Sequence, residues 1–148
     1  MIYADTGFLV SLNVHSDAHS APALKFYETN QDRIWLWSPW HRVELFNTLR
    51  QLTRDNAKPF TVGEAKGVIH EIEADVRVGY FTHKEADWRD VLRKANEISA
   101  ASAFNHPCRS ADLLHVAYAV ELSAQLFVSY DRDQLALAKA AGLQTQSP

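Results

Sequence analysis

Cysteine, proline and glycine are scarce in this sequence, and each shortage excludes a class of protein. Cys108 is the only cysteine, so the chain can form neither an internal disulfide nor a zinc site built from thiolates. With 5 prolines and 5 glycines among 148 residues, the chain is not a collagen-like or low-complexity polymer. A single cysteine is typical of a reducing compartment, and we therefore expect a cytoplasmic protein.

Long apolar runs and an excess of basic residues are also missing. No apolar run approaches the roughly 20 residues that span a bilayer, and the N-terminal segment M-I-Y-A-D lacks the features of a signal peptide. We expect no membrane partner. The 15 Lys and Arg against 18 Asp and Glu give a net charge of −3, which is not the basic signature of a nucleic-acid binder. If four of the acidic residues were gathered in one metal site, the net charge of the other residues would be close to zero. The overall negative charge therefore does not exclude a polyanionic partner.

Hydrophobic residues make up 47% of the chain, which is enough to build a core, and we expect a single domain over residues 1–148. Short apolar runs at 2–4, 34–37 and 126–129 are typical of buried strands, and a further strand is expected at 143–145. Segments with apolar residues three or four apart predict helices between them, near 8–12, 18–28, 39–55, 61–74, 85–103, 112–123 and 131–141. Alternating strands and helices predict an α/β domain with a mainly parallel sheet.

Local signals place the starts of several helices. Ser38 before Pro39 is a typical helix start, and Thr61 with Glu64 three residues later matches a capping box. Ser110 is expected to cap the helix that follows it.

Four acidic residues stand at the ends of elements or among apolar neighbours. Asp5 ends the first strand, and Asp131 follows the strand at 126–129. Asp112 lies in the first turn of an apolar helix, and Glu44 interrupts an apolar stretch of another. Parallel sheets bind ligands at the carboxyl ends of their strands, and carboxylates gathered there repel one another unless a cation joins them. An oxygen-preferring ion such as Mg²⁺ or Mn²⁺ fits that requirement.

Each acid also has a purely structural interpretation. Asp131 forms a plausible capping box with Gln134, and Asp112 suits the positive end of a helix dipole. Asp5 could be a turn residue, and Glu44 could lie on a solvated helix face.

Several segments together resemble a known family. They are Asp5-Thr6 after the first strand, V-E-L-F-N-T-L-R with Glu44 and Asn47, R-S-A-D-L-L-H-V-A-Y-A around Asp112, and F-V-S-Y-D-R-D-Q-L-A-L-A-K-A-A-G-L around Asp131. In order and spacing they resemble the PIN domain, and within it the VapC-like toxins of bacterial and archaeal toxin–antitoxin pairs. The resemblance covers essentially the whole chain.

The resemblance implies a three-layer α/β/α sandwich and a metal-dependent endoribonuclease, the toxin of a type II pair. Asp5, Glu44, Asp112 and Asp131 would be both the catalytic residues and the ligands of Mg²⁺ or Mn²⁺. Such an ion neutralises the phosphate and activates a water, so no histidine base is needed. The implied partners are an RNA substrate, a cognate antitoxin protein inserting into the acidic groove, and a second copy of the chain.

Other residues receive supporting or structural assignments. Thr6, Asn47 and Ser129 are expected to support the acids, and Asp133 competes with Asp131 for its role. Apolar helix faces that include Trp40, Phe46 and Phe60 are expected to form the homodimer. Core packing is expected for Trp35, Trp37 and His115, and a loop or helix cap is expected for His15 and His19. Five arginines are expected on the solvated surface, with binding of RNA phosphates as the alternative: Arg42, Arg50, Arg54, Arg109 and Arg132.

Alternative functions stay open. A receiver-like signalling domain also gathers acids at strand ends, but it normally needs a lysine after a late strand, and 126–129 offers none. A dehalogenase-like phosphatase would need a second Asp at the position of Gly7. A PIN-like RNA-binding or scaffold module without cleavage remains, although all four acids are present.

Overall fold

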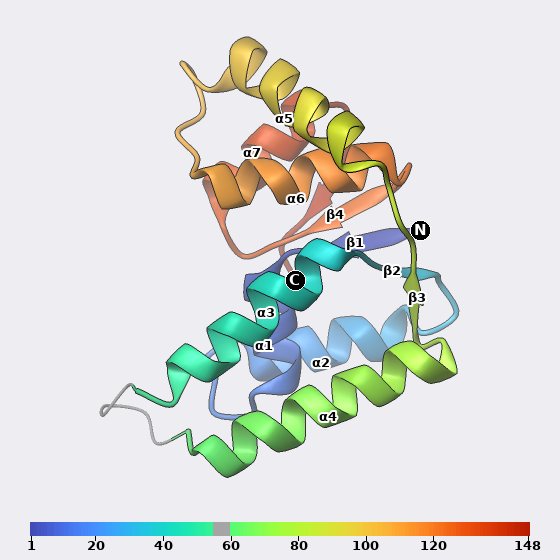
Figure 1. Cartoon of the computed structure of the whole chain (residues 1–148), viewed down its shortest axis with the longest axis vertical. Coiled ribbons are helices and arrows are strands. Elements are labelled where there is room, and N and C mark those ends of the chain that lie inside the picture. The colour runs from blue at the N-terminus through green and yellow to red at the C-terminus, as the bar shows by residue number, and fades with distance from the viewer. Residues whose placement is uncertain (55–59) are drawn as a thin grey trace.

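Five short parallel strands form the central sheet of the protein in the computed structural model, which describes residues 1–54 and 60–148 (Figure 1). The order across the sheet is β3-β2-β1-β4-β5. The strands are β1 (Ile2–Ala4), β2 (Trp35–Trp37), β3 (Phe81–His83), β4 (Leu126–Val128) and β5 (Gln144–Gln146). The predicted α/β class and parallel sheet are confirmed. Strand β3 was not predicted, because its three residues give no readable pattern.

Seven helices in the described residues connect and cover the strands. They are α1 (Thr6–Asn13), α2 (Ser20–Thr29), α3 (Pro39–Leu52), α4 (Val62–Val78), α5 (Trp88–Ser102), α6 (Ser110–Glu121) and α7 (Arg132–Ala140). The residue near which α3 was predicted to end, 55, lies outside the described part of the chain. Among the described helices, none is both long enough and apolar enough to cross a membrane.

Two of the three predicted helix caps are confirmed. The Ser38 hydroxyl accepts from the backbone N–H of His41, and the Thr61 hydroxyl accepts from that of Glu64. The prediction that Ser110 caps α6 is wrong. Ser110 is already the first helical residue, Arg109 occupies the cap position, and the Asp112 carboxylate accepts the backbone N–H of Arg109 at 2.9 Å.

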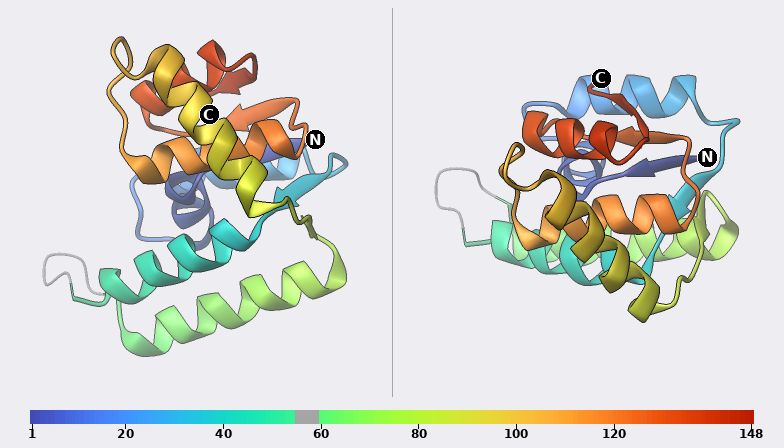
Figure 2. Two further views of the ribbon diagram at one scale, coloured as in Figure 1. Left: turned by 45° about the horizontal axis from the view of Figure 1, so that its top comes forward. Right: turned by 90° about the horizontal axis from the view of Figure 1, so that it is seen from above.

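Side chains alternate between the two faces of the sheet and build a separate core on each. On one face, Ile2, Ala4, Trp35 and Trp37 pack with residues of α1, α2, α3 and α4. On the other, Tyr3, Leu36 and Phe127 pack with residues of α5, α6 and α7. The views in Figures 1 and 2 show these helix groups on opposite sides of the strands, which gives the expected three-layer sandwich.

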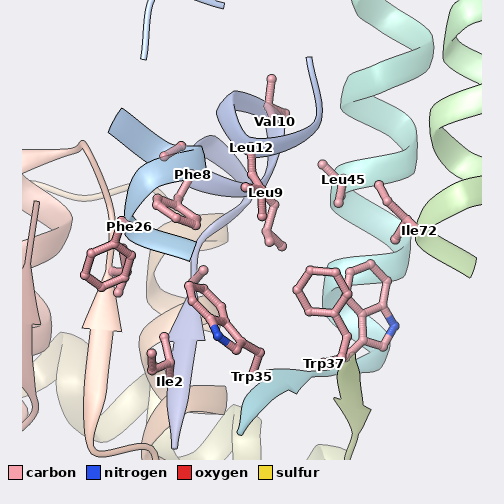
Figure 3. Close-up of a cluster of buried hydrophobic side chains, with 14 of the residues drawn as sticks. Ile2, Phe8, Leu9, Val10, Leu12, Phe26, Trp35, Trp37, Leu45 and Ile72 are labelled. Carbon is pink, nitrogen blue, oxygen red and sulfur yellow. The ribbon is translucent and has the colours of Figure 1, made fainter. Parts of the chain in front are cut away.

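Aromatic side chains pack against one another in the first of these cores, and Figure 3 shows Phe8, Phe26, Trp35 and Trp37 among its residues. The ring of Trp35 is stacked on Phe8 with centroids 5.9 Å apart, and Trp37 lies 6.1 Å from Phe46. Both tryptophans are almost fully buried, as predicted. Trp35 thus packs β2 against α1, the helix that follows Asp5, and Trp37 packs β2 against α3.

The two middle strands define where a site can form. After β1 the chain runs to β2 and β3 on one side, and it then returns to β4, next to β1, before it reaches β5. The carboxyl ends of β1 and β4 therefore meet at the switch point of the topology, the usual ligand position in open α/β sheets. The backbone N–H of Asp5 donates to the carbonyl of Val128 at 2.9 Å and holds the two ends together.

Candidate active site

Asp5 is a buried carboxylate at the end of β1 and also the N-cap of α1. Its Oδ1 accepts the backbone N–H of Phe8 at 2.7 Å, and its Oδ2 accepts the Ser129 hydroxyl at 2.8 Å. Burial raises the pKa of Asp5 above its ordinary value, and the nearby charge of Glu44 raises it further, although these hydrogen bonds and His115 act in the opposite direction. No Lys or Arg within 1–54 and 60–148 forms a recorded ion pair with it. The two groups that donate hydrogen bonds to the Asp5 carboxyl, the Phe8 N–H and the Ser129 hydroxyl, are both neutral.

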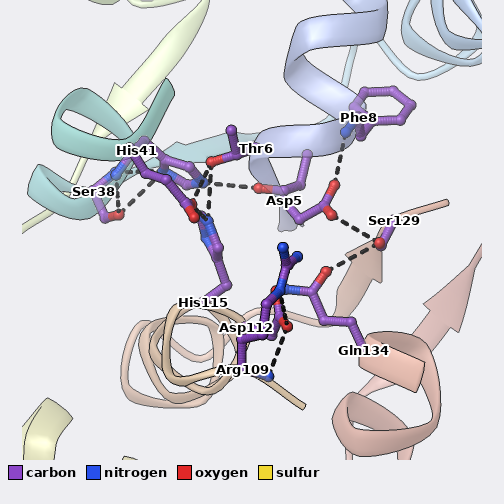
Figure 4. A network of polar contacts seen from close by, with 12 residues as sticks. Asp5, Thr6, Phe8, Ser38, His41, Arg109, Asp112, His115, Ser129 and Gln134 are labelled. Carbon is purple, nitrogen blue, oxygen red and sulfur yellow. Dashed lines mark hydrogen bonds and ion pairs between the residues drawn. The ribbon is translucent and has the colours of Figure 1, made fainter. Parts of the chain in front are cut away.

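Ser129 links the ends of the two middle strands. Its hydroxyl, fully buried, lies 2.8 Å from Asp5 Oδ2 and 3.0 Å from Gln134 Oε1, and it accepts the backbone N–H of Asp131 at 2.9 Å. The supporting position predicted for Ser129 is thus next to Asp5 (Figure 4).

Glu44 reaches the same region from α3. Its Oε2 accepts the Thr6 hydroxyl at 2.6 Å and contacts Nε2 of His115. Burial alone would raise the pKa of Glu44, but the hydrogen bonds from His115 and Thr6 and the charge of His115 hold it below its usual value. Glu44 is half-buried and hydrogen-bonded by neighbouring elements, so it is not a freely solvated helix residue.

A chain of buried polar groups extends from His115, which contacts Glu44, and Figure 4 shows His115, Ser38 and His41 within it. Nδ1 of His115 lies 3.0 Å from the Tyr3 hydroxyl, which lies 3.3 Å from the Ser38 hydroxyl. Burial raises the pKa of Tyr3 well above its ordinary value, so the Tyr3 hydroxyl keeps its proton. The prediction that His115 lies in the core is confirmed, and its hydrogen-bond partners include the Glu44 carboxylate.

His41 ends this chain of contacts inside the sheet. Its Nδ1 accepts the backbone N–H of Ser38 at 3.0 Å, so Nε2 carries the proton and donates to the carbonyl of Ala4 at 2.8 Å. Burial lowers the pKa of His41 to about 3, which keeps the ring neutral. The network thus connects the Glu44 side chain to the backbone carbonyl of Ala4, the residue before Asp5.

Asp112 faces the site from the first turn of α6 and is paired with Arg109. Nε of Arg109 lies 3.2 Å from Oδ2 of Asp112, and Nη2 lies 3.2 Å from Oδ1. The hydrogen bonds and charge of Asp112 raise the pKa of Arg109, and the charges of Asp131 and Glu44 contribute in the same direction. Arg109 therefore lies within electrostatic reach of three of the four predicted acids.

Asp131 caps α7, as its structural interpretation predicted. Its Oδ1 accepts the backbone N–H groups of Asp133 and Gln134 at 2.8 and 3.1 Å. The capping box is not reciprocal, because the Gln134 side chain is engaged by Ser129. Both Asp131 and Asp133 are exposed, and Asp131 is the one that directly follows the Ser129 link.

The four acids reach one end of the sheet without closing around a single point. Among the residues that the structure describes, no three His, Cys, Asp or Glu side chains are grouped as a ready metal cluster. Asn47, expected beside Glu44, is exposed, and no hydrogen bond of its side chain is recorded within the described ranges. The donor oxygens are of the type that Mg²⁺ and Mn²⁺ prefer, but Asp112 is occupied by Arg109.

Sequence reasoning missed the groups that hold the acids in place. The ion pair of Arg109 with Asp112 and the roles of Tyr3 and His41 were not predicted. One signal was present, since His41 stands three residues after the Ser38 cap, a position whose side chain often reaches back to the cap. Tyr3 gave no signal, because its partners lie far away in the sequence.

Comparisons with known proteins concern the fold. No family model and no curated protein matches the sequence. Among solved structures, Mycobacterium tuberculosis VapC20, described as a sarcin–ricin loop cleaving toxin, superposes with a TM-score of 0.70 at 18% identity over 100% of both chains.

Two further structures give the same result. FitAcB from Neisseria gonorrhoeae has a TM-score of 0.68 at 17% identity and covers 98% of this chain and 96% of its own. VapBC-1 from nontypeable Haemophilus influenzae has a TM-score of 0.64 at 15% identity and covers 99% of this chain and 98% of its own. The expected three-layer α/β/α architecture is confirmed, and the chain shares the fold of these three structures, as its resemblance to the PIN domain implied.

Proposed function

We propose that the chain is a Mg²⁺- or Mn²⁺-dependent endoribonuclease and the toxin of a type II toxin–antitoxin pair. The fold shared with VapC20, described as a toxin that cleaves the sarcin–ricin loop, supports a nuclease. The fold shared with VapBC-1 supports an antitoxin partner. RNA is the proposed substrate, and a homodimer in the cytoplasm is the proposed active form.

The observation that carries this proposal is the position of Asp5. A buried carboxylate with a raised pKa, at the switch point of a parallel sheet and without a recorded cationic partner in the described residues, costs stability. Proteins keep such groups where a ligand compensates them, and a divalent cation is the ligand that oxygen donors select.

Four carboxylates would hold the ion, namely Asp5, Glu44, Asp112 and Asp131. When bound, it would neutralise charge on the phosphodiester and lower the pKa of an attacking water. Phe8 and Ser129 fix both oxygens of Asp5, while Thr6 and His115 fix one oxygen of Glu44. His115 is only 2% exposed, so it orients Glu44 and does not itself contact RNA.

A cleavage assay on the purified full chain tests the proposal. Labelled ribosomal RNA and a pool of RNA oligonucleotides are incubated with protein in Mn²⁺ or in EDTA. We expect cleavage in Mn²⁺, none in EDTA, and at least about a hundredfold loss in Asp5→Asn, as for removal of a group that stabilises transition-state charge. Asn also caps helices well, so this variant keeps the start of α1.

Asp90→Asn is the matched control. Asp90 lies in α5 and pairs with Arg93 on an exposed surface, so its loss removes one carboxylate away from the site. We expect wild-type cleavage from this variant. RNA binding without cleavage under any divalent ion would contradict the nuclease and would favour a PIN-like RNA-binding module.

A further inference from the structure

Arg109 covers Asp112 from the solvent side. Its side chain is 81% exposed, whereas that of Asp112 is 12% exposed, and two of its nitrogens face the two carboxylate oxygens. This two-point contact is the strong, planar form of the arginine–carboxylate pair. Both oxygens of a proposed metal ligand are thus already in contact with a cation.

The guanidinium also points into the acidic region. Figure 4 shows it projecting from the start of α6 toward Asp5. The charges of Asp131 and Glu44 act on it in addition to that of Asp112. Four carboxylates near one another would repel, and a fixed positive charge among them reduces that repulsion without any metal.

We propose that Arg109 is the resting cation of this site, and that a divalent ion must displace its guanidinium from Asp112 in order to bind. The inference rests on the proposed metal site and adds a regulation to it. The guanidinium takes up one side of each Asp112 oxygen, so a divalent ion that uses Asp112 as a ligand competes with Arg109 for the same carboxylate. The pair therefore raises the metal concentration at which the site fills.

Manganese titration of the metal-free full chain by calorimetry tests this competition at low ionic strength. Arg109→Gln removes the charge, and we expect it to bind Mn²⁺ about tenfold more tightly than wild type, which corresponds to about 1.4 kcal/mol. Arg109→Lys keeps the charge but loses the planar fork, and we expect binding about threefold tighter. Simple charge repulsion without competition would leave Arg109→Lys at the wild-type affinity.

Arg89→Gln provides the control for net charge. Arg89 pairs with Asp87 at the start of α5, is 89% exposed, and lies outside the site, so we expect unchanged Mn²⁺ affinity. Circular dichroism in EDTA checks that each variant is folded, as expected for an exposed side chain.

The outcomes separate the two proposals. Wild-type Mn²⁺ affinity in both Arg109 variants, with measurable binding by all proteins, would overturn the competition and leave the nuclease proposal standing. Absence of Mn²⁺ binding in every protein would overturn both. Tighter binding in Arg109→Gln and Arg109→Lys, but not in Arg89→Gln, supports the displacement.

Discussion

The imidazole of His115 contacts the carboxylate of Glu44, although 71 residues separate them in the sequence. The contact joins α6 to α3 across the end of the central strands, and it places a buried ring behind a half-buried acid. Because a carboxylate only accepts hydrogen bonds, Nε2 of His115 donates to Glu44.

Replacement of His115 by Leu should therefore destabilise the protein. Glu44 and the Tyr3 hydroxyl would each lose a partner, and a buried polar group left without one costs about 1–3 kcal/mol. Urea unfolding should show a lower midpoint with an unchanged slope. The exposed His70 on α4 gives the control His70→Leu, which should unfold like the wild type. Equal stability of both variants would contradict the structural role of His115.

Replacement of Asp5 by Asn should stabilise the metal-free protein at neutral pH. The raised pKa means that the native state resists the ionisation of Asp5, so removal of the charge should raise the Tm of the metal-free protein. Millimolar Mn²⁺ should raise the Tm of the wild type by mass action and leave Asp5→Asn unchanged. Thermal unfolding with and without Mn²⁺ measures both effects. An unchanged wild-type Tm across the titration would count against metal binding.

His41 should make folding sensitive to acid. The unfolded chain takes up a proton at the ordinary pKa of 6.5, whereas the native ring does so only at about 3. The unfolded state thus binds more protons between these values, and stability falls as the pH is lowered, by up to about 1.4 kcal/mol per pH unit.

His41→Gln removes this titration and keeps a side chain that suits the capping box with Ser38. Urea unfolding between pH 3 and 7 should give a shallower loss of stability in acid for this variant than for the wild type. His70→Gln, on the exposed face of α4, should keep the wild-type slope. Parallel curves for all three proteins would show that His41 does not titrate as its burial requires.

Asp131 and Asp133 should differ in catalysis. Asp131 uses only Oδ1 for the helix cap, which leaves Oδ2 free of any recorded partner in the described residues. Asp131→Asn should abolish cleavage and preserve the fold, because Asn is itself a good cap. Asp133→Asn should keep most of the activity. The reverse result in the RNA assay would transfer the role to Asp133, and unfolding of Asp131→Asn would favour a capping role alone.

The chain should form a homodimer through α3 and α4. Phe46, which was expected in the interface, is only 4% exposed and belongs to the core. Val43 and Val62 are each 59% exposed and are the apolar side chains available for this contact. Sedimentation at micromolar concentration should give twice the mass of 16.7 kDa, and Val43→Asp should shift it toward the monomer. A wild-type monomer that still cleaves RNA would contradict the dimer and leave the nuclease intact.

The sequence by itself determined most of the elements and the strand ends at which Asp5 and Asp131 lie. Apolar runs such as that of β4 and the Ser38 and Thr61 caps depend on neighbouring residues, so their prediction needed no tertiary information. The position of Asp5 after a strand of a parallel sheet likewise followed from the pattern. Ser110 does not cap the helix, because the helix already begins at Ser110 and the Asp112 side chain accepts the N–H of Arg109, the residue before it.

The tertiary structure alone decided how the acids are held. The contact of Glu44 with His115 and the link from Ser129 to Asp5 join residues 71 and 124 positions apart, and no local pattern encodes such a distance. Arg109 and Asp112 are only three residues apart, but the charges of Glu44 and Asp131, which add to the effect of Asp112 on the pKa of that arginine, come from other elements. Burial, which sets the pKa of Asp5 and of His41, is a property of the packed layers and exists only once both cores have formed.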